Sequence, residues 1–144
     1  MIKVLMAVFT KTLSFSTKGD GDMIDITANV QDVLAESSVK NGIVTVFVPG
    51  STASVTTIEY EPGLIQDFPR AMNKIAPKEA HYDHNARWGD GNGHSHVKAS
   101  TIGPSLVVPF ENKRLLLGTW QQIVFVDFDN RPRSRHVVVQ ALGE

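Results

Sequence analysis

The sequence contains no cysteine among its 144 residues, and this absence excludes a disulfide framework, a thiolate zinc site, a cysteine nucleophile and a thiol redox centre. It also lacks a charge excess of either sign, since 14 Lys and Arg stand against 15 Asp and Glu and the sequence pI is near 6.5. This balance argues against a nucleic-acid partner, because nucleic-acid binders normally carry a strong basic excess. Positive charge is concentrated only in residues 131–135, which include three arginines.

A long hydrophobic run is missing as well. The apolar stretch that follows Lys3 is interrupted at Thr10, which makes it too short to span a bilayer, and it has no small-residue cleavage site of a signal peptide. We therefore expect a cytoplasmic protein with no membrane partner. The length and a hydrophobic content of 42% fit one domain, spanning residues 1–144, with a sizeable core.

The apolar periodicity predicts an α+β fold. Alternation over the first seventeen residues, beginning at Val4, indicates one or two strands. Helical spacing predicts a helix from about Ile26, capped by Asp25 or Thr27, a second from Pro62 to near Pro77, and a short third from about Ser95 to Ile102. A long polar loop over 77–94 precedes the third helix. Further strands are predicted at 43–48, 54–60, 105–110, 114–128 and 135–142. The expected fold is a single domain with a mainly antiparallel β-sheet, two longer helices and one short helix.

Histidines cluster in one part of the chain. Four of the five, His81, His84, His94 and His96, lie within residues 81–96. Neutral imidazole is a common ligand of zinc and other divalent metals, and a catalytic zinc typically takes three protein ligands. The residues alone leave a second interpretation open, in which these are solvated histidines of a glycine-bearing loop.

Several residues could bind a phosphate. Ser95 stands at the predicted start of the third helix, where free N–H groups favour an anion, and Lys98 adds positive charge. The hydroxyls of Thr52 and Ser54 lie between two predicted strands, and Arg135 enters the last strand. The alternative is that Ser95 only caps the helix, that the hydroxyls belong to an ordinary loop and that the charged groups face solvent.

Two other side chains fit a catalytic or binding role. Glu59 lies in an apolar strand, where a carboxylate needs a partner, a metal or a raised pKa, unless it faces solvent from an edge strand. Trp120 follows Gly118 in a β-branched run and could stack on a planar ligand, although a core position is the commoner fate of a tryptophan.

Taken together and in order, these segments match one known family over nearly the whole chain from about residue 43. The matching residues are Thr-Ala-Ser at 52–54, Glu59, Pro62, Asp67, Tyr-Asp-His-Asn at 82–85, Ser-His-Val-Lys-Ala-Ser at 95–100, Ile-Gly at 102–103, Ser-Leu-Val-Val-Pro at 105–109, Gly-Thr-Trp-Gln at 118–121, Arg135 and Leu-Gly-Glu at 142–144. The sequence resembles the YjbQ-like proteins, also described as secondary thiamine-phosphate synthases. It departs from many relatives in having Gly50 and Ser51 where they carry a histidine.

The resemblance implies a small α+β protein that assembles as a homotrimer, with a polar site near the subunit boundaries. It also implies a weak ability to join hydroxymethylpyrimidine diphosphate to thiazole phosphate, giving thiamine phosphate and pyrophosphate. On this hypothesis the catalytic residues are Glu59, His96 and Lys98. The substrate contacts are Thr52, Ser54, Ser95, Trp120, Gln121 and Arg135. A divalent metal, zinc or magnesium, would be held by His84, His94 and His96, where His94 is included for its place in the cluster and not for the resemblance. Alternatively, His84 and His96 would hold a substrate phosphate directly.

Two other functions fit the same residues. One is a metal-dependent phosphoester hydrolase, in which the histidines hold a metal whose bound water is the nucleophile. The other is a non-catalytic trimer that binds a small anionic ligand without changing it. Whether the protein is an enzyme at all therefore stays open at the level of the sequence.

Overall fold

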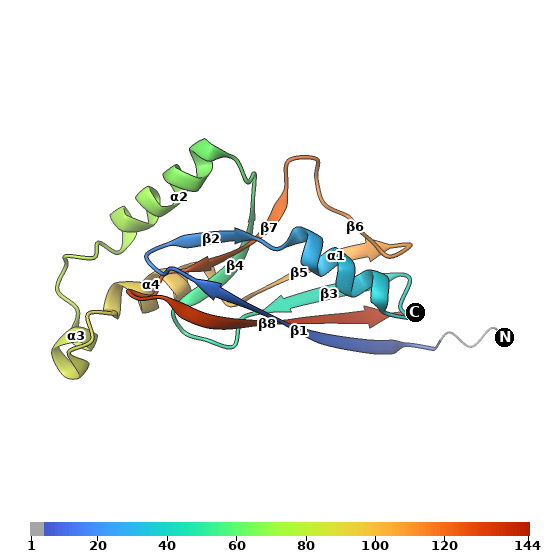
Figure 1. The fold of residues 1–144 in the computed structure, drawn as a ribbon, viewed down its shortest axis with the longest axis horizontal. Coiled ribbons are helices and arrows are strands. Elements are labelled where there is room, and N and C mark those ends of the chain that lie inside the picture. The colour runs from blue at the N-terminus through green and yellow to red at the C-terminus, as the bar shows by residue number, and fades with distance from the viewer. Residues whose placement is uncertain (1–4) are drawn as a thin grey trace.

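The computed structural model describes residues 5–144, so Val4 of the first predicted strand lies outside the described residues. The strands form two antiparallel sheets, one of five strands in the order β1-β8-β3-β5-β6 and one of three in the order β2-β7-β4 (Figure 1). The α+β class and the antiparallel pairing are confirmed. The elements are β1 (Ala7–Thr17), β2 (Asp22–Asp25), α1 (Thr27–Glu36), β3 (Gly42–Phe47), β4 (Ala53–Ile58), α2 (Pro62–Ile75), α3 (Asp83–Trp88), α4 (Gly93–Ile102), β5 (Ser105–Glu111), β6 (Arg114–Leu115), β7 (Gln122–Asp127) and β8 (Arg133–Gly143).

The core has two apolar clusters, one on each face of the three-stranded sheet. The first fills the space between the two sheets, where Phe15 of β1 meets Phe125 of β7 edge-on with ring centroids 4.9 Å apart. The second lies between the three-stranded sheet and the helices α2 and α4, and contains Val124, Val126 and Met72. Because successive strand residues point to opposite faces, β7 contributes to both clusters, which explains its continuous apolar run.

Local sequence explains where the two longer helices begin. The N-terminus of α2 is capped by Glu61, whose carboxylate accepts hydrogen bonds from the N–H groups of Gly63 and Leu64, and Pro62 occupies the first turn as predicted. The cap position of α1 is Ile26, so the predicted caps Asp25 and Thr27 are wrong. Asp25 instead accepts the backbone N–H of Thr27 at 2.9 Å from just outside the helix.

The structure corrects the prediction for residues 77–102. The predicted loop contains the short helix α3, so there are four helices among the described residues instead of three. Helix α4 begins at Gly93 and its cap position is Asn92, so Ser95 is inside the first turn and is not the cap. Only glycine fits at this first helical position, because a Cβ on Gly93 would lie only 2.6 Å from the Cβ of Tyr82 just before α3.

The predicted strand over 114–128 is also wrong as a single element. It divides into β6 of the large sheet and β7 of the small sheet, and residues 116–121 form the connection between them. Gly118 lies in this connection, where its backbone N–H donates to the side-chain oxygen of Gln121. The chain can therefore leave one sheet and enter the other, which a continuous strand could not do.

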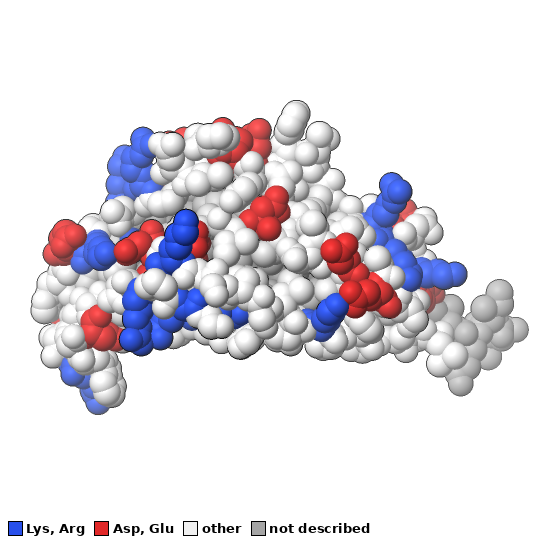
Figure 2. Space-filling view, viewed as in Figure 1, with Lys and Arg blue, Asp and Glu red and all other residues white. Residues whose placement is uncertain are grey.

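Helices α2, α3 and α4 gather at one end of the molecule, whereas α1 lies near the C-terminus at the other end (Figure 1). None of the helices within residues 5–144 combines the length and the apolar character that crossing a membrane requires. Charged side chains of both signs are interspersed over the face drawn in Figure 2, in keeping with the balanced composition.

Candidate functional site

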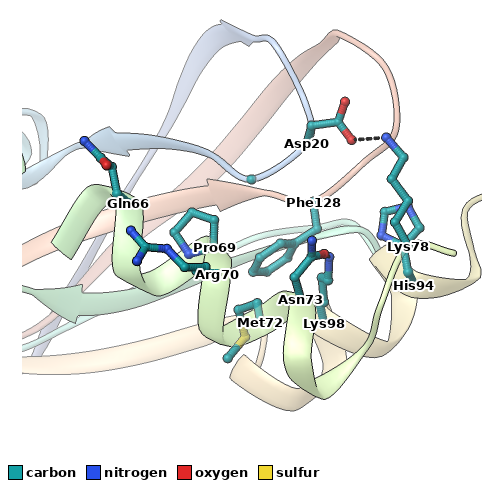
Figure 3. Close-up of a pocket in the computed structure, with 11 residues that line it drawn as sticks. Asp20, Gln66, Pro69, Arg70, Met72, Asn73, Lys78, His94, Lys98 and Phe128 are labelled. Atoms are coloured by element: carbon teal, nitrogen blue, oxygen red, sulfur yellow. Dashed lines mark hydrogen bonds and ion pairs between the residues drawn. The ribbon is translucent and has the colours of Figure 1, made fainter. Parts of the chain in front are cut away.

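A cavity of about 360 Å³ opens between α2, α4 and the turn that joins β1 to β2. We call it the α2–α4 pocket, and it is shown in Figure 3. Its volume falls within the range of roughly 300–1,000 Å³ that is usual for small-molecule sites. The lining residues are Asp20, Gly21, Gln66, Pro69, Arg70, Met72, Asn73, Lys78, His94, Lys98 and Phe128.

Lys98 and His94 form the buried floor of this pocket. They are one helical turn apart on α4 and so share a face, with 6% and 1% of their surfaces exposed. The Lys98 Nζ donates a hydrogen bond to Asn73 Oδ1 on α2 at 2.7 Å. Among residues 5–144, Lys98 forms no ion pair with a carboxylate, an uncommon state for a buried lysine.

Burial also changes the acid–base properties of these two groups. Loss of solvent lowers the pKa of Lys98, and the charge of Asp20 offsets this only in part. Loss of solvent likewise lowers the pKa of His94, and the positive charges of Lys98 and Lys78 add to the effect. His94 Nδ1 is buried and has no hydrogen-bond partner within the described part of the chain. Burial therefore disfavours the charged forms of the two basic side chains on the floor.

The rim of the pocket carries further positive charge. Lys78 Nζ lies 2.7 Å from Asp20 Oδ1, and this ion pair joins the segment after α2 to the β1–β2 turn (Figure 3). Arg70 of α2 is exposed, with its guanidinium 3.4 Å from Asp67 outside the pocket. Three cationic side chains and one carboxylate thus line the α2–α4 pocket, and that carboxylate is already paired. The pocket therefore carries a positive excess suited to an anion.

The structure brings His84 and His96 together at a different place. Their ring centroids are 4.5 Å apart between α3 and α4, and His84 Nδ1 lies 3.2 Å from Asp90 Oδ1 without hydrogen-bond geometry. His96 faces a separate cavity beside Gly50 and Ser51. His94 is not part of this pair, because residues two apart on a helix point in different directions.

The metal site expected from His84, His94 and His96 has no preformed cage. Within residues 5–144, no three or more His, Cys, Asp or Glu side chains are grouped so as to hold a metal ion. The pair of His84 and His96 with Asp90 nearby supplies the right donor types for zinc, but the donors lack the arrangement of a closed site. The expectation of a divalent metal stays a prediction.

Arg135 and Thr52, which we predicted to contact substrate, lie in a buried network of charges. Arg135 Nε donates to Asp127 Oδ2 at 2.7 Å and one of its terminal nitrogens donates to Asp127 Oδ1 at 2.8 Å. The same terminal nitrogen donates to the Thr52 hydroxyl, which in turn donates to Asp129 Oδ2 at 3.0 Å. Arg133 completes the network at 2.9 Å from Asp129 Oδ2. These contacts tie the start of β4 to β8.

The network also shifts the pKa values of Asp129 and Arg135. Burial by itself would raise the pKa of Asp129, but hydrogen bonds from Arg133 and Thr52, among others, outweigh burial and hold the pKa below its usual value. The hydrogen bonds to Asp127 raise the pKa of Arg135 further above its ordinary value, against the effect of burial. Both groups are therefore charged in the folded protein.

The remaining predicted contacts are distributed over the fold. Ser54 and Ser95 are buried and donate to the carbonyl oxygens of Ala99 at 2.8 Å and Phe128 at 2.5 Å, so their hydroxyls join elements of the core. Glu59 is exposed just after β4 and lines neither the α2–α4 pocket nor the cavity beside His96.

Trp120 and Gln121 lie in the connection between β6 and β7. Trp120 has 71% of its surface exposed, so within this chain it is not a core residue. Gln121 Nε2 donates to the Thr57 hydroxyl at 3.1 Å. Neither lines the α2–α4 pocket, and a contact with substrate stays a prediction for both.

Sequence reasoning missed Asp20, Asn73, Lys78 and Arg70. They come from a turn, a helix and a loop that are far apart in the chain, and no motif links them. The buried Asp127–Arg135 pair had a signal, since two carboxylates end an apolar run directly before the three arginines of 131–135.

Comparison with known proteins gives consistent matches. The family model described as "UPF0047 protein YjbQ-like" matches residues 11–144. A UPF0047 protein of Methanothermobacter thermautotrophicus is 38% identical over 141 residues, which cover 98% of this chain and 96% of that protein. A UPF0047 protein of Bacillus subtilis is 38% identical over 134 residues, which cover 92% of this chain and 98% of that protein.

Solved structures of similar proteins have the same fold as this chain. A YbjQ-like protein of unknown function from Sulfolobus solfataricus superposes with a TM-score of 0.92 at 34% identity, covering 97% of this chain and all of that one. A YjbQ/UPF0047 family protein from Clostridium acetobutylicum gives a TM-score of 0.82 at 38% identity, covering 90% of this chain and 97% of that one. The match of both sequence and fold over nearly the whole length leads to one conclusion: this chain belongs to the YjbQ-like UPF0047 family.

Proposed function

We propose that the protein binds a small phosphorylated molecule in the α2–α4 pocket and acts on it there. The observation that carries this proposal is the buried Lys98, which lacks a carboxylate partner and lies in a pocket with a positive excess. An isolated buried cation is costly, and an anionic ligand would supply the missing counter-charge. Lys78 and Arg70 at the rim are placed to receive the outer oxygens of the same ligand.

The reaction that we propose is the joining of hydroxymethylpyrimidine diphosphate to thiazole phosphate. Its chemistry needs stabilisation of the leaving pyrophosphate and positioning of two rings, with little covalent work by the protein. Cationic side chains beside the apolar wall of Met72, Pro69 and Phe128 are suited to these tasks. In this proposal Lys98 assists the leaving group. Glu59 and His96 would contribute from outside the pocket.

The pairing of His84 with His96 favours a second candidate function, a metal-dependent phosphoester hydrolase. Two imidazoles with ring centroids 4.5 Å apart and Asp90 beside them would hold zinc once small movements complete the ligand set. The metal would lower the pKa of a bound water. This candidate shares His96 with the synthase proposal but does not need Lys98, so the Lys98→Met variant separates the two.

We also propose a homotrimer. The register places Val8, Leu142, Ile43 and Pro109 in one row across four neighbouring strands of the five-stranded sheet, on the face away from the core, and all four are exposed. A contiguous apolar row of this kind is typical of an interface between subunits. The association state follows from light scattering of the purified protein.

A product assay tests the synthase proposal. Purified protein is incubated with the two phosphorylated precursors, and thiamine phosphate is separated by chromatography while pyrophosphate is followed by phosphorus NMR. We expect both products in equal amounts from the wild type and from Lys74→Met, which removes an exposed lysine of α2 outside the pocket. Lys98→Met should lose at least about tenfold in rate, equivalent to about 1.4 kcal/mol of transition-state stabilisation.

The same preparation tests the alternatives. Hydrolysis of a generic phosphate ester that depends on added zinc and is lost in His96→Ala, but not in Lys98→Met, would favour the hydrolase. Thermal stabilisation by pyrophosphate with no chemical change in any substrate would indicate the non-catalytic binder. No thiamine phosphate from either wild type or Lys74→Met would contradict the synthase proposal.

A further inference from the structure

The turn between β1 and β2 holds a charged residue in a backbone conformation that favours glycine. Gly19, Asp20 and Gly21 have φ values of +77°, +53° and +87°, so all three lie in the left-handed region. Glycine adopts this region freely, whereas residues with a side chain are disfavoured there, asparagine and aspartate least of all. Glycine would therefore fit the middle position with less strain. Residues held in such conformations cluster at functional sites, which points to a role for the Asp20 side chain.

The backbone of this turn is fixed by the end of β7 and the residues after it. The N–H group of Asp20 donates to the carbonyl oxygen of Asp129, and that of Gly21 donates to the carbonyl oxygen of Asp127, both at 2.7 Å. The approach is close, because a Cβ on Gly19 would lie 2.5 Å from the carbonyl oxygen of Asp129. The Asp20 side chain is therefore carried at the rim of the α2–α4 pocket by a backbone that the sheet holds in place.

The partner of this carboxylate is Lys78. Its Nζ lies 2.7 Å from Asp20 Oδ1, and the two side chains reach toward each other from the segment after α2 and from the β1–β2 turn (Figure 3). Neither side chain forms another ion pair within residues 5–144. Lys78 lies just beyond the end of α2 and has a flexible four-carbon stem, so it is the partner that can move.

This ion pair is weak enough to be exchanged for a ligand. The side chains of Lys78 and Asp20 are 45% and 56% exposed, and ion pairs between exposed groups contribute little net free energy. A phosphate group carries more negative charge than a carboxylate and binds an ammonium group through charge-assisted hydrogen bonds. A phosphate group can therefore take the Lys78 amine from Asp20, but part of the gain is lost because the existing contact has to break.

Only the outer part of a ligand meets this competition. In the proposed function one phosphate group lies on the floor at Lys98, and a second anionic group, where the ligand has one, reaches the rim at Lys78. A single phosphate on the floor leaves the pair of Asp20 and Lys78 intact. A diphosphate that also uses the rim has to break it.

From these contacts we propose that Asp20 is a positioning residue that sets the selectivity of the α2–α4 pocket, because it competes with the outer phosphate group of a ligand for Lys78. The competition lowers the affinity for a diphosphate and leaves the affinity for a single phosphate unchanged. This inference rests on the proposed function in that the pocket binds phosphate groups. In the proposed joining reaction it favours the release of pyrophosphate, the product that the rim would otherwise retain.

Calorimetric titration with two probes, inorganic phosphate and pyrophosphate, tests this proposal at fixed pH and ionic strength. Asp20→Asn and Asp20→Gly remove the carboxylate, and both replacements tolerate a positive φ, so thermal unfolding should show folded proteins. We expect both variants to bind pyrophosphate about threefold more tightly than the wild type, which is within the range that an exposed ion pair contributes. Because the floor is unchanged, their affinity for inorganic phosphate should change by less than about 1.5-fold.

Two further variants show whether the effect is local to the rim. Lys78→Met removes the contested amine, so it should bind pyrophosphate about threefold more weakly and inorganic phosphate as the wild type does. Asp32→Asn is the matched control, because it removes an exposed carboxylate of α1 at the other end of the molecule (Figure 1). It should leave both affinities unchanged.

The outcomes separate this inference from the proposed function. Binding of pyrophosphate by the wild type, with equal or lower affinity in Asp20→Asn, would overturn the inference and leave the proposed function standing. An equal change for both probes, an equal gain in Asp32→Asn, or wild-type affinity for pyrophosphate in Lys78→Met would also overturn it, since none of these results is a competition for Lys78. No binding of either probe to any of the proteins would overturn the inference and the proposed function together.

Discussion

Replacing Lys98 by methionine should make the protein more stable. Methionine fills nearly the same space as the lysine stem but has no amine to desolvate. Burying a polar group without a compensating hydrogen bond costs about 1–3 kcal/mol in mutational data. The hydrogen bond to Asn73, at 2.7 Å, returns about 0.5–1.5 kcal/mol. The expected gain in the free energy of unfolding is therefore about 0.5–1.5 kcal/mol.

This gain is measurable by thermal unfolding. For a domain of 144 residues, 1 kcal/mol corresponds to roughly 2–4 °C in Tm, so Lys98→Met should unfold a few degrees above the wild type. Lys74→Met is the matched control, because Lys74 is an exposed lysine of α2 and its replacement should change stability by less than about 0.5 kcal/mol.

On this account Lys98 is kept for function at a cost in stability, which is a common property of binding and active sites. A decrease of more than about 1 kcal/mol in the free energy of unfolding of Lys98→Met, with that of Lys74→Met unchanged, would refute this account of Lys98. Such a loss would mean that the amine of Lys98 supports the packing of α2 on α4, and that the pocket around it is a by-product of that support.

Three further predictions concern residues outside the α2–α4 pocket. Arg135→Met should destabilise the fold by about 3–5 kcal/mol in urea unfolding, because it leaves the fully buried Asp127 carboxylate without its charged partner, whereas Arg131→Met, at an exposed position, should have little effect. Asp129→Asn should flatten the pH dependence of the free energy of unfolding. The pKa of Asp129 is lowered in the fold, so its carboxylate stabilises the fold above about pH 4, and this stabilisation is lost as the pH falls through the lowered pKa. An unchanged slope of the free energy of unfolding against pH in acid would contradict this. Trp120→Ala should leave both Tm and phosphate binding within error of the wild type, since the side chain is 71% exposed and does not line the pocket; a fall in either would give Trp120 a role that this chain alone does not show.

The sequence predicted what depends on local pattern. Helix α2 begins at Pro62 as expected, because proline at the first turn and the capping Glu61 are local signals. The strands β3 and β8 were predicted within two residues, since their β-branched runs are continuous. The early start of α4 was missed because Gly93 is a weak helix former, and the close approach of Tyr82 that requires a glycine at this position belongs to the tertiary structure.

The candidate site was harder to predict for the same physical reason. His94 and Lys98 share a helix face, so their proximity follows from spacing once α4 begins at Gly93. The packing of α2 and of the β1–β2 turn against α4 brings Asp20, Asn73 and Lys78 next to His94 and Lys98. Nothing in the local sequence of these three residues indicates that they lie together. Predicted phosphate contacts such as Arg135 carry the right charge, but a carboxylate in the core already neutralises that charge.

Calorimetric titration with pyrophosphate tests the central claim most directly. The claim is that the α2–α4 pocket binds a phosphorylated molecule through Lys98, so the wild type and Lys74→Met should bind pyrophosphate with one site per chain. Lys98→Met should bind at least tenfold more weakly, a loss of about 1.4 kcal/mol. Equal affinity in all three proteins, or no binding to the wild type, would contradict the account.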